Sequence, residues 1–270
     1  MLRDQFITHH KAVVDGFRWR SREIARIEGF SDACFGFAVT LLIISLEVPR
    51  TSTELFEAMR GFIAFFATFW VLASIWYGQF LYFRRYGLED RITVILNLVL
   101  IFTVLFFVYP LKFFFSTLIE NRGLGGTIKT AHEVEQVILP EHKPLLLLVF
   151  GLGFAAVFAV FLLLYLHAYR QRESLGLNEL EVFETMHSIR AQLFAIGTGL
   201  TYLVLAGVLA LPRTTPNEKL LVRILSFGSA IVLFALVGWI MNTRRKRSAW
   251  VKQWHASNES ATRLHDAPSS

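Results

Sequence analysis

The stretch Arg26-Ile-Glu-Gly-Phe30-Ser31-Asp32, followed directly by the apolar run from Ala33 to Val48, decides how this chain folds. A helix over residues 30–48 has close to the ~20 apolar residues that cross ~30 Å of hydrocarbon. Its start carries a cation, a hydroxyl and a carboxylate. Charged groups in or beside hydrocarbon are costly, so they usually hold helices together or handle an ion or a substrate. The stretch therefore predicts a membrane-spanning helix whose first residues have a structural or functional task.

The composition extends this prediction to the whole chain. Of the 270 residues, 54% are hydrophobic and 26 are phenylalanine, and the mean hydropathy is +0.48. Six apolar windows are long enough to span a membrane: residues 30–48, 56–83, 92–115, 144–167, 191–211 and 220–241. The single cysteine, Cys34, excludes an intrachain disulfide. The sequence predicts an all-α polytopic membrane protein with six transmembrane helices.

The basic residues indicate how the spans are oriented. Most of the 27 lysines and arginines lie in the N-terminal segment, in loops 84–91 and 170–190, and in the C-terminal tail. The positive-inside rule places both termini in the cytoplasm of a multi-pass protein of the cell membrane, and loop 116–143 outside. We expect a cytoplasmic segment 1–29, a six-helix transmembrane domain 30–241 and a basic, partly disordered cytoplasmic tail 242–270. The net charge of +6 is then explained by anionic lipid rather than by nucleic acid.

The segments outside the spans give weaker patterns. The N-terminal residues 1–25 and the start of the first span have a loose helical spacing of apolar residues, which is compatible with a helix lying on the membrane; these residues are Val13, Val14, Phe17, Ile24 and Ile27. The acidic residues of loop 170–190 alternate with apolar ones, which favours the solvated face of a short connecting helix; they are Glu173, Glu179, Glu181 and Glu184. His167, at the end of a span, is read as an interfacial residue rather than a metal ligand.

No pattern indicates an enzyme, since HExxH, GxSxG, Walker and GxGxxG motifs are absent from any suitable context. A coupled transporter would often have ionisable residues at mid-bilayer, and the span centres contain almost none. Two glycine pairs, Gly151 with Gly153 and Gly197 with Gly199, favour close helix packing over a break in the helix.

The first span has an apolar stripe made of Ala33, Phe37, Thr40, Leu41 and Ile44. Several copies of this stripe around an axis would enclose a narrow apolar passage, and such constrictions control conduction by dewetting. Taken alone, the stripe favours ordinary helix packing, because any apolar helix offers such a stripe. The polar residues before it are also open to two interpretations, because Arg26 could anchor to headgroups while Ser31 or Asp32 caps the helix.

These residues resemble a known family. Arg26-xxx-Phe30-Ser31-Asp32, then Thr40-Leu41-Leu42 and Pro49, is similar to the first helix of the transmembrane protein 175 family of potassium channels. The resemblance extends through the second and third spans to residue 112 by way of Trp76, Phe83, Arg84, Asn97 and Pro110.

The resemblance implies an unconventional potassium-channel fold in which four six-span chains form a homotetramer. The first helix of each chain would line the pore, with Phe37 at the constriction and Thr40, Leu41 and Ile44 beside it. A polar network near the cytoplasmic mouth would join the first three helices. The residues implied for this network are Arg26, Phe30, Ser31, Asp32, Trp76 and Asn97.

The chain departs from the family pattern at two places. Phe37 stands where the family usually has Ile or Leu, and Gln79-Phe80 stands where it often has a His pair. The expected function is passive, potassium-selective conduction without a cofactor, with potassium ions, membrane lipids and further copies of the chain as partners. A six-helix secondary transporter of an ion or small molecule is the alternative, and a membrane scaffold without transport is the third possibility.

Overall fold

Long antiparallel helices dominate the structure. The computed structural model of the protein describes residues 13–14, 17–21, 23–44, 51–120, 127–129, 134–136 and 142–210. Its helices are α2 (Arg26–Ile44), α3 (Ser52–Tyr86), α4 (Arg91–Glu120), α5 (Lys143–Arg170) and α6 (Glu179–Ala210). Four of these described helices contain segments long and apolar enough to cross a membrane: Arg26–Ile44, Gly61–Tyr86, Arg91–Ser116 and Pro144–Arg170.

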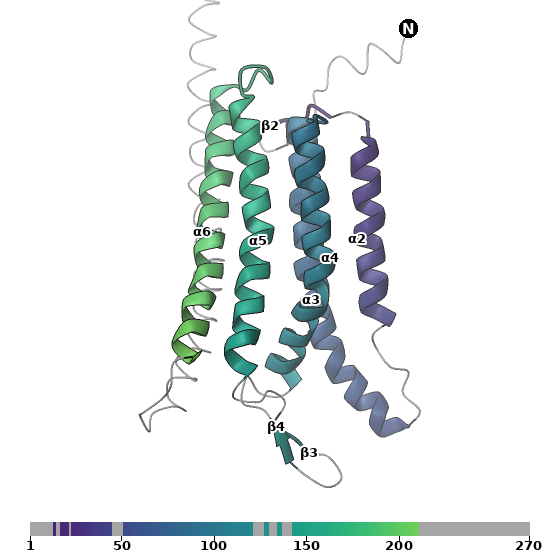
Figure 1. The fold of residues 1–270 in the computed structure, drawn as a ribbon. Coiled ribbons are helices and arrows are strands. Elements are labelled where there is room, and N and C mark those ends of the chain that lie inside the picture. Colours follow the sequence, from purple (N-terminus) through teal and green to yellow (C-terminus); the bar gives the residue numbers. More distant parts are fainter. Residues whose placement is uncertain are drawn as a thin grey trace, which may run out of the picture.

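The helices are arranged in chain order across the bundle. Figure 1 shows α2 at one edge, α3 and α4 in the middle, and the closely packed pair α5 and α6 at the other edge. The first four expected spans lie within α2, α3, α4 and α5 with shifts of a few residues, except that Ser45 to Val48 fall outside the described residues. The fifth expected span lies in α6 up to Ala210, whereas the sixth span, 220–241, and the tail 242–270 lie outside the described residues.

Apolar side chains fill the space between the helices and also cover the outside of the bundle. The core takes Phe35 and Ala38 from α2, Tyr82 from α3, Leu100 from α4 and Leu164 from α5. Large apolar residues on the outside include Phe62, Phe66, Trp70, Phe102 and Phe106. A surface of this kind is stable in hydrocarbon and unfavourable in water. The chain is therefore an integral membrane protein.

Glycines allow the closest helix contacts. A Cβ atom on Gly199 of α6 would lie 2.9 Å from the Cβ of Ala155 on α5, and one on Gly151 would lie 2.8 Å from Leu203 Cδ2. Gly153 meets the ring of Phe107 on α4 in the same way. Both helices run unbroken through these positions. The prediction of close packing is confirmed for these glycines, whereas Gly197 faces open space.

Two short hairpins lie at opposite ends of the bundle (Figure 1). Strand β1 (Val13–Val14) pairs antiparallel with β2 (Phe17–Arg18), with Val14 opposite Phe17. Strand β3 (Thr127–Lys129) pairs with β4 (Val134–Gln136) in the expected external loop, with Ile128 opposite Glu135. Residues 17–21, which we call the strap, cross the bundle end at which α2 begins and α3 ends, and we call this end the strap end.

The expectation of a membrane-surface helix within residues 1–25 is wrong for Val13, Val14 and Phe17, which lie in the paired strands β1 and β2, whereas residues 1–12 lie outside the described residues. Phe17 is fully buried, and its ring packs edge-on against Tyr86 at a centroid distance of 5.6 Å. A helical spacing over so few residues does not distinguish a helix from an extended segment that inserts one ring into a core.

The expectation for the acidic loop residues is also wrong in part. Residues 179–190 are the first turns of α6 rather than a separate connecting helix. Glu173 and Glu179 are exposed, but Glu181 and Glu184 are buried. A buried carboxylate requires charged or hydrogen-bonding partners, and those of Glu181 are Arg18 and Arg20 of the strap and the backbone N–H of Asn178.

Candidate functional site

Helix α2 has two distinct faces. Its buried residues are Glu28, Ser31, Phe35, Ala38 and Leu42, at alternating steps of three and four, and this face packs against α3 and α4. Of the four predicted pore residues, Phe37 and Ile44 have 59% and 76% of their surface exposed, Thr40 is exposed and Leu41 is half-buried. Within one chain, the predicted pore face is therefore directed mainly away from the bundle.

The hydroxyl of Thr40 is engaged with its own helix. Its Oγ1 donates a hydrogen bond of 2.7 Å to the backbone oxygen of Phe37. This bond uses the only proton of the hydroxyl, so towards any other group Thr40 acts as an acceptor. Thr40 thus presents an exposed oxygen acceptor between Phe37 and Ile44.

The buried face of α2 carries a polar junction. Asn97 Nδ2 on α4 donates to Ser31 Oγ at 2.8 Å, and Gln79 Nε2 on α3 donates to Asn97 Oδ1. Ser31 Oγ in turn donates to the backbone oxygen of Ile27 at 2.7 Å. The side chains of Ser31, Gln79 and Asn97 are all buried, so water cannot reach them. Removing one of them would leave a polar group of its neighbour without a hydrogen-bond partner. The junction thus links α2, α3 and α4.

A second contact joins α2 to α3 one residue further on. Trp76 Nε1 donates a hydrogen bond of 2.7 Å to Asp32 Oδ1, and the indole ring stacks on Phe80 at 6.0 Å. Helix α2 begins at Arg26, so Ser31 and Asp32 lie inside it. The alternative that either residue caps the helix is therefore wrong.

The structure brings together four of the six residues that the sequence proposed for the network, namely Ser31, Asp32, Trp76 and Asn97. Phe30 is exposed, and Arg26 is exposed with no hydrogen bond or ion pair in the described part of the chain. Gln79 belongs to this junction, although the family resemblance did not place it in the polar network. Its position, where the family often has a His pair, was the only signal for it.

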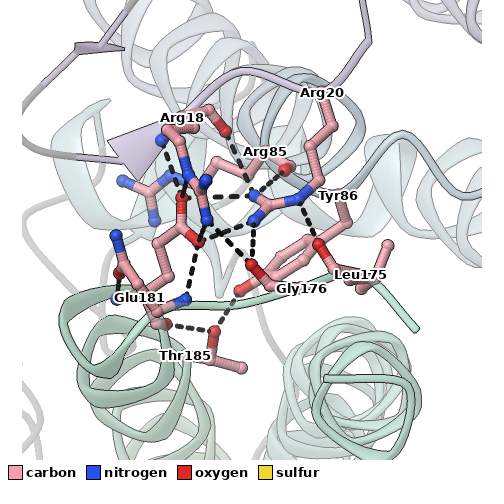
Figure 2. Close-up of polar contacts among 9 residues, drawn as sticks. Arg18, Arg20, Arg85, Tyr86, Leu175, Gly176, Glu181 and Thr185 are labelled. Atoms are coloured by element: carbon pink, nitrogen blue, oxygen red, sulfur yellow. Dashed lines mark hydrogen bonds and ion pairs between the residues drawn. The ribbon is translucent and has the colours of Figure 1, made fainter. Parts of the chain in front are cut away.

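The strap forms a further polar cluster with the turn between α5 and α6. Figure 2 shows the guanidinium groups of Arg18 and Arg20 converging on the carboxylate of Glu181. Arg20 Nη2 lies 2.6 Å from Glu181 Oε2, and Arg18 Nη2 lies 3.1 Å from the same oxygen. Arg18 also donates its backbone N–H to Glu181 Oε1 at 3.0 Å. Burial acts to raise the pKa of Glu181, but these bonds outweigh it and lower that pKa to about 2.

His167, predicted to be an interfacial residue, makes an ion-pair contact at the strap end. Its Nε2 lies 2.8 Å from Asp90 Oδ2 and 3.0 Å from Gln171 Nε2. Thr93 Oγ1 donates to the other oxygen of Asp90 at 2.6 Å. Burial acts to raise the pKa of Asp90, yet the bond from Thr93 and the nearby His167 lower it overall. No group of three His, Cys, Asp or Glu side chains suited to a metal ion occurs among the described residues.

Known proteins share both this sequence and this fold. The family model of the endosomal/lysosomal potassium channel TMEM175 matches residues 26–107, which contain α2, α3, the polar junction and most of α4. A potassium channel of Marivirga tractuosa is 38% identical over 190 residues, which are 70% of this chain and 77% of that protein. A potassium channel of Streptomyces collinus is 29% identical over 107 residues, or 37% of this chain and 52% of that protein.

A solved structure agrees with these sequence matches. The crystal structure of a variant of the potassium channel MtTMEM175, bound to a nanobody fusion protein, superposes with a TM-score of 0.67 at 32% sequence identity. The match covers 86% of this chain and 97% of that one. Because a relative of 38% identity is matched over most of its length and the fold agrees, this chain belongs to the TMEM175 family.

Proposed function

We propose that this protein is a potassium-selective channel in which four chains place α2 around a common axis. Family membership supports potassium conduction, since the matched relatives are named potassium channels. The observation that carries the assembly is the exposed apolar face of α2, whose opposite face is held by α3 and α4. One helix per chain encloses a passage only when several chains form a closed ring.

The constriction in this proposal consists of four copies of Phe37. Aromatic rings at the narrowest point exclude water, and an apolar constriction of this kind raises the barrier to an ion. Ring faces also attract cations electrostatically, which offsets part of that barrier. Thr40 adds four oxygen acceptors one turn away, with Leu41 and Ile44 beyond them. Conduction by this route is passive and requires no cofactor or catalytic residue.

The proposed orientation places the strap end in the cytoplasm. This end carries the basic residues Arg18, Arg20, Arg84, Arg85, Arg170 and Arg172. Cytoplasmic loops concentrate Lys and Arg, and the inner leaflet has anionic lipids that these side chains contact. We place the protein in the cell membrane, with segments 1–29 and 242–270 on the cytoplasmic side of a transmembrane domain 30–241. The β3–β4 hairpin then lies outside.

Recording from the purified protein tests this function. After reconstitution into a planar bilayer, the channel should give discrete, voltage-driven unitary currents that reverse near the potassium equilibrium potential. Potassium efflux from liposomes should need no second substrate. Slow uptake that depends on a second ion or solute, without unitary currents, would instead identify a secondary transporter and refute the channel.

A further inference from the structure

The strap lies where three parts of the chain meet. It follows β1, crosses the end of α3 and the turn between α5 and α6, and leads shortly afterwards into α2 at Arg26 (Figure 1). Arg20 donates its backbone N–H to the backbone oxygen of Arg84 at 3.0 Å, which fixes the strap to the last turn of α3. Gly87, with φ +59, ends α3 beneath the strap, and a Cβ there would lie 3.3 Å from the backbone nitrogen of Ser21.

Apolar contacts seat one side of the strap. Phe17 is buried against Tyr86, and the guanidinium of Arg85 lies 5.2 Å from the centre of the Phe17 ring. The ring of Trp19 packs edge-on against Phe80 at 6.1 Å. Phe80 also stacks on Trp76, the partner of Asp32 on α2. The strap is thus in contact with the group of side chains that positions α2.

Polar contacts seat the other side. Arg18 and Arg20 stand two residues apart in an extended segment, so their side chains point the same way, towards the α5–α6 turn. Both bind Glu181, and they also donate to the turn itself: Arg18 to Gly176 O at 2.8 Å and Arg20 to Leu175 O at 3.0 Å. Arg20 Nη1 reaches Arg85 O at 3.2 Å. The side chain of Glu181 is fully buried, and both guanidinium groups form their ion pair with its carboxylate. Within this cluster, the two arginines therefore share one counter-charge.

We propose that the strap is a mechanical link between the α5–α6 turn and α2, and that Glu181 is the positioning residue that keeps it seated. This inference rests on the proposed function, in which α2 lines the pore. A seated strap holds the first turn of α2 at a fixed distance from α6. When the strap is released, α2 keeps its contacts at Ser31 and Asp32 but loses the restraint on its first turn.

The position of the link determines what it controls. Phe37 lies on the far side of the Ser31 and Asp32 contacts from the strap. Release should therefore leave the width and chemistry of the constriction unchanged, while the start of α2 moves more freely. The expected consequence is faster exchange between channel states, with unitary conductance and preference for potassium over sodium unchanged.

Glu181→Gln releases the link and Glu179→Gln is its matched control. Both substitutions remove one negative charge from the first turn of α6, but Glu179 is exposed and makes no contact with the strap in the described structure. In the purified full-length protein, trypsin should cut after Arg18 and Arg20 about tenfold faster in Glu181→Gln, because cleavage follows the population of the released strap. The backbone N–H of Gly29, which donates to Ala25 O at 3.1 Å in the first turn of α2, should exchange its hydrogen about threefold faster. Glu179→Gln should match the wild type in both assays.

Single-channel recording then links the strap to the pore. Glu181→Gln should shorten the open and closed dwell times and leave the unitary conductance unchanged. Arg18→Ala keeps Arg20 bound to Glu181, so it should shorten the dwell times to a smaller extent. This second variant replaces Glu181→Gln if Glu181→Gln does not fold. Unchanged trypsin cleavage would refute the role of Glu181. Faster cleavage with unchanged hydrogen exchange at Gly29 and unchanged dwell times would show that the strap is not linked to α2. A wild-type protein without potassium currents would refute the proposed function instead, while the cleavage and hydrogen-exchange assays would still test the link.

Discussion

Asn97 on α4 donates a hydrogen bond of 2.8 Å from its Nδ2 to Ser31 Oγ on α2, and both side chains are buried. This bond directs the face of α2 that carries Ser31 towards α3 and α4. The other face, which carries Phe37, is therefore directed away from the bundle of one chain. Between two helices in hydrocarbon, such a bond contributes modestly to stability but determines rotation, because any other rotation leaves polar groups without partners. The junction therefore sets which face of α2 is available to the pore.

Ser31→Ala tests this junction, and Ser74→Ala is a close control. Each serine donates a 2.7 Å hydrogen bond to the backbone oxygen four residues earlier, but within the described helices Ser31 alone of the two also accepts one from another helix. Ser31→Ala should lower the free energy of unfolding by about 1–3 kcal/mol, since Asn97 is left with an unpaired donor. Ser74→Ala should change it by less than about 0.5 kcal/mol. Thermal unfolding in detergent measures both, and equal effects would contradict the junction.

Trp76→Phe tests the contact to Asp32. The substitution keeps a ring against Phe80 but removes the indole N–H that donates to Asp32. Because the acceptor is a carboxylate at a partly exposed site, the loss should be about 1 kcal/mol. Trp70→Phe is the control, since Trp70 is exposed and, among the described rings, contacts Phe66 alone in a tilted arrangement. If the two variants melt at the same temperature, the Trp76 bond does not hold α2.

The packing of α6 on α5 predicts opposite results at two neighbouring glycines. Gly199→Ala should destabilise the protein by about 1–3 kcal/mol, because the added methyl group would overlap Ala155. Gly197→Ala should be neutral or stabilising by up to about 1 kcal/mol, since the position faces open space and alanine favours a helix. Unfolding temperatures in one detergent provide the comparison. Destabilisation at Gly197 equal to that at Gly199 would contradict the described contact.

The strap should resist moderate acid. The pKa of Glu181 is lowered to about 2 from 4.5, so the seated strap is stabilised above pH 4.5 and loses this stabilisation as the pH falls towards 2. Hydrogen exchange at the backbone N–H of Arg20 should give a constant opening equilibrium from about pH 7 to pH 5. Below 4.5, opening should increase by about tenfold per pH unit, because one more proton binds the open form. An increase already near pH 6 would contradict the assignment of Glu181 as the group that holds the strap.

The sequence predicted much of the membrane part and of the junction. Long apolar windows predicted the four candidate spans, because length and hydropathy are sufficient to identify a spanning helix. Ser31, Asp32, Trp76 and Asn97 were expected to meet, and the structure brings them into two adjacent contacts. Neither Arg26 nor Phe30 joins these contacts in the described structure, since a shared motif does not specify which of its side chains turns inward.

Contacts between distant parts of the chain could not be predicted. Arg18 and Glu181 are separated by 163 residues, and neither local pattern indicates the other. Glu181 alternates with apolar residues as a solvated helix face would, so its burial depends on a strap that the pattern does not show. Gln79 was noted as a departure from the family but not assigned to the network, because a buried amide between two helices does not indicate its partner on another helix.

The unitary potassium conductance of Phe37→Ala tests the central proposal most directly. Phe102→Ala removes the same side chain from an exposed position on α4 and controls for the loss of an outer aromatic ring. If four copies of Phe37 form the constriction, Phe37→Ala should increase the unitary conductance and weaken the discrimination against sodium, while Phe102→Ala leaves both as in the wild type. Unchanged conductance and selectivity in Phe37→Ala channels that assemble normally would contradict the assignment of α2 as the pore helix with Phe37 at its narrowest point.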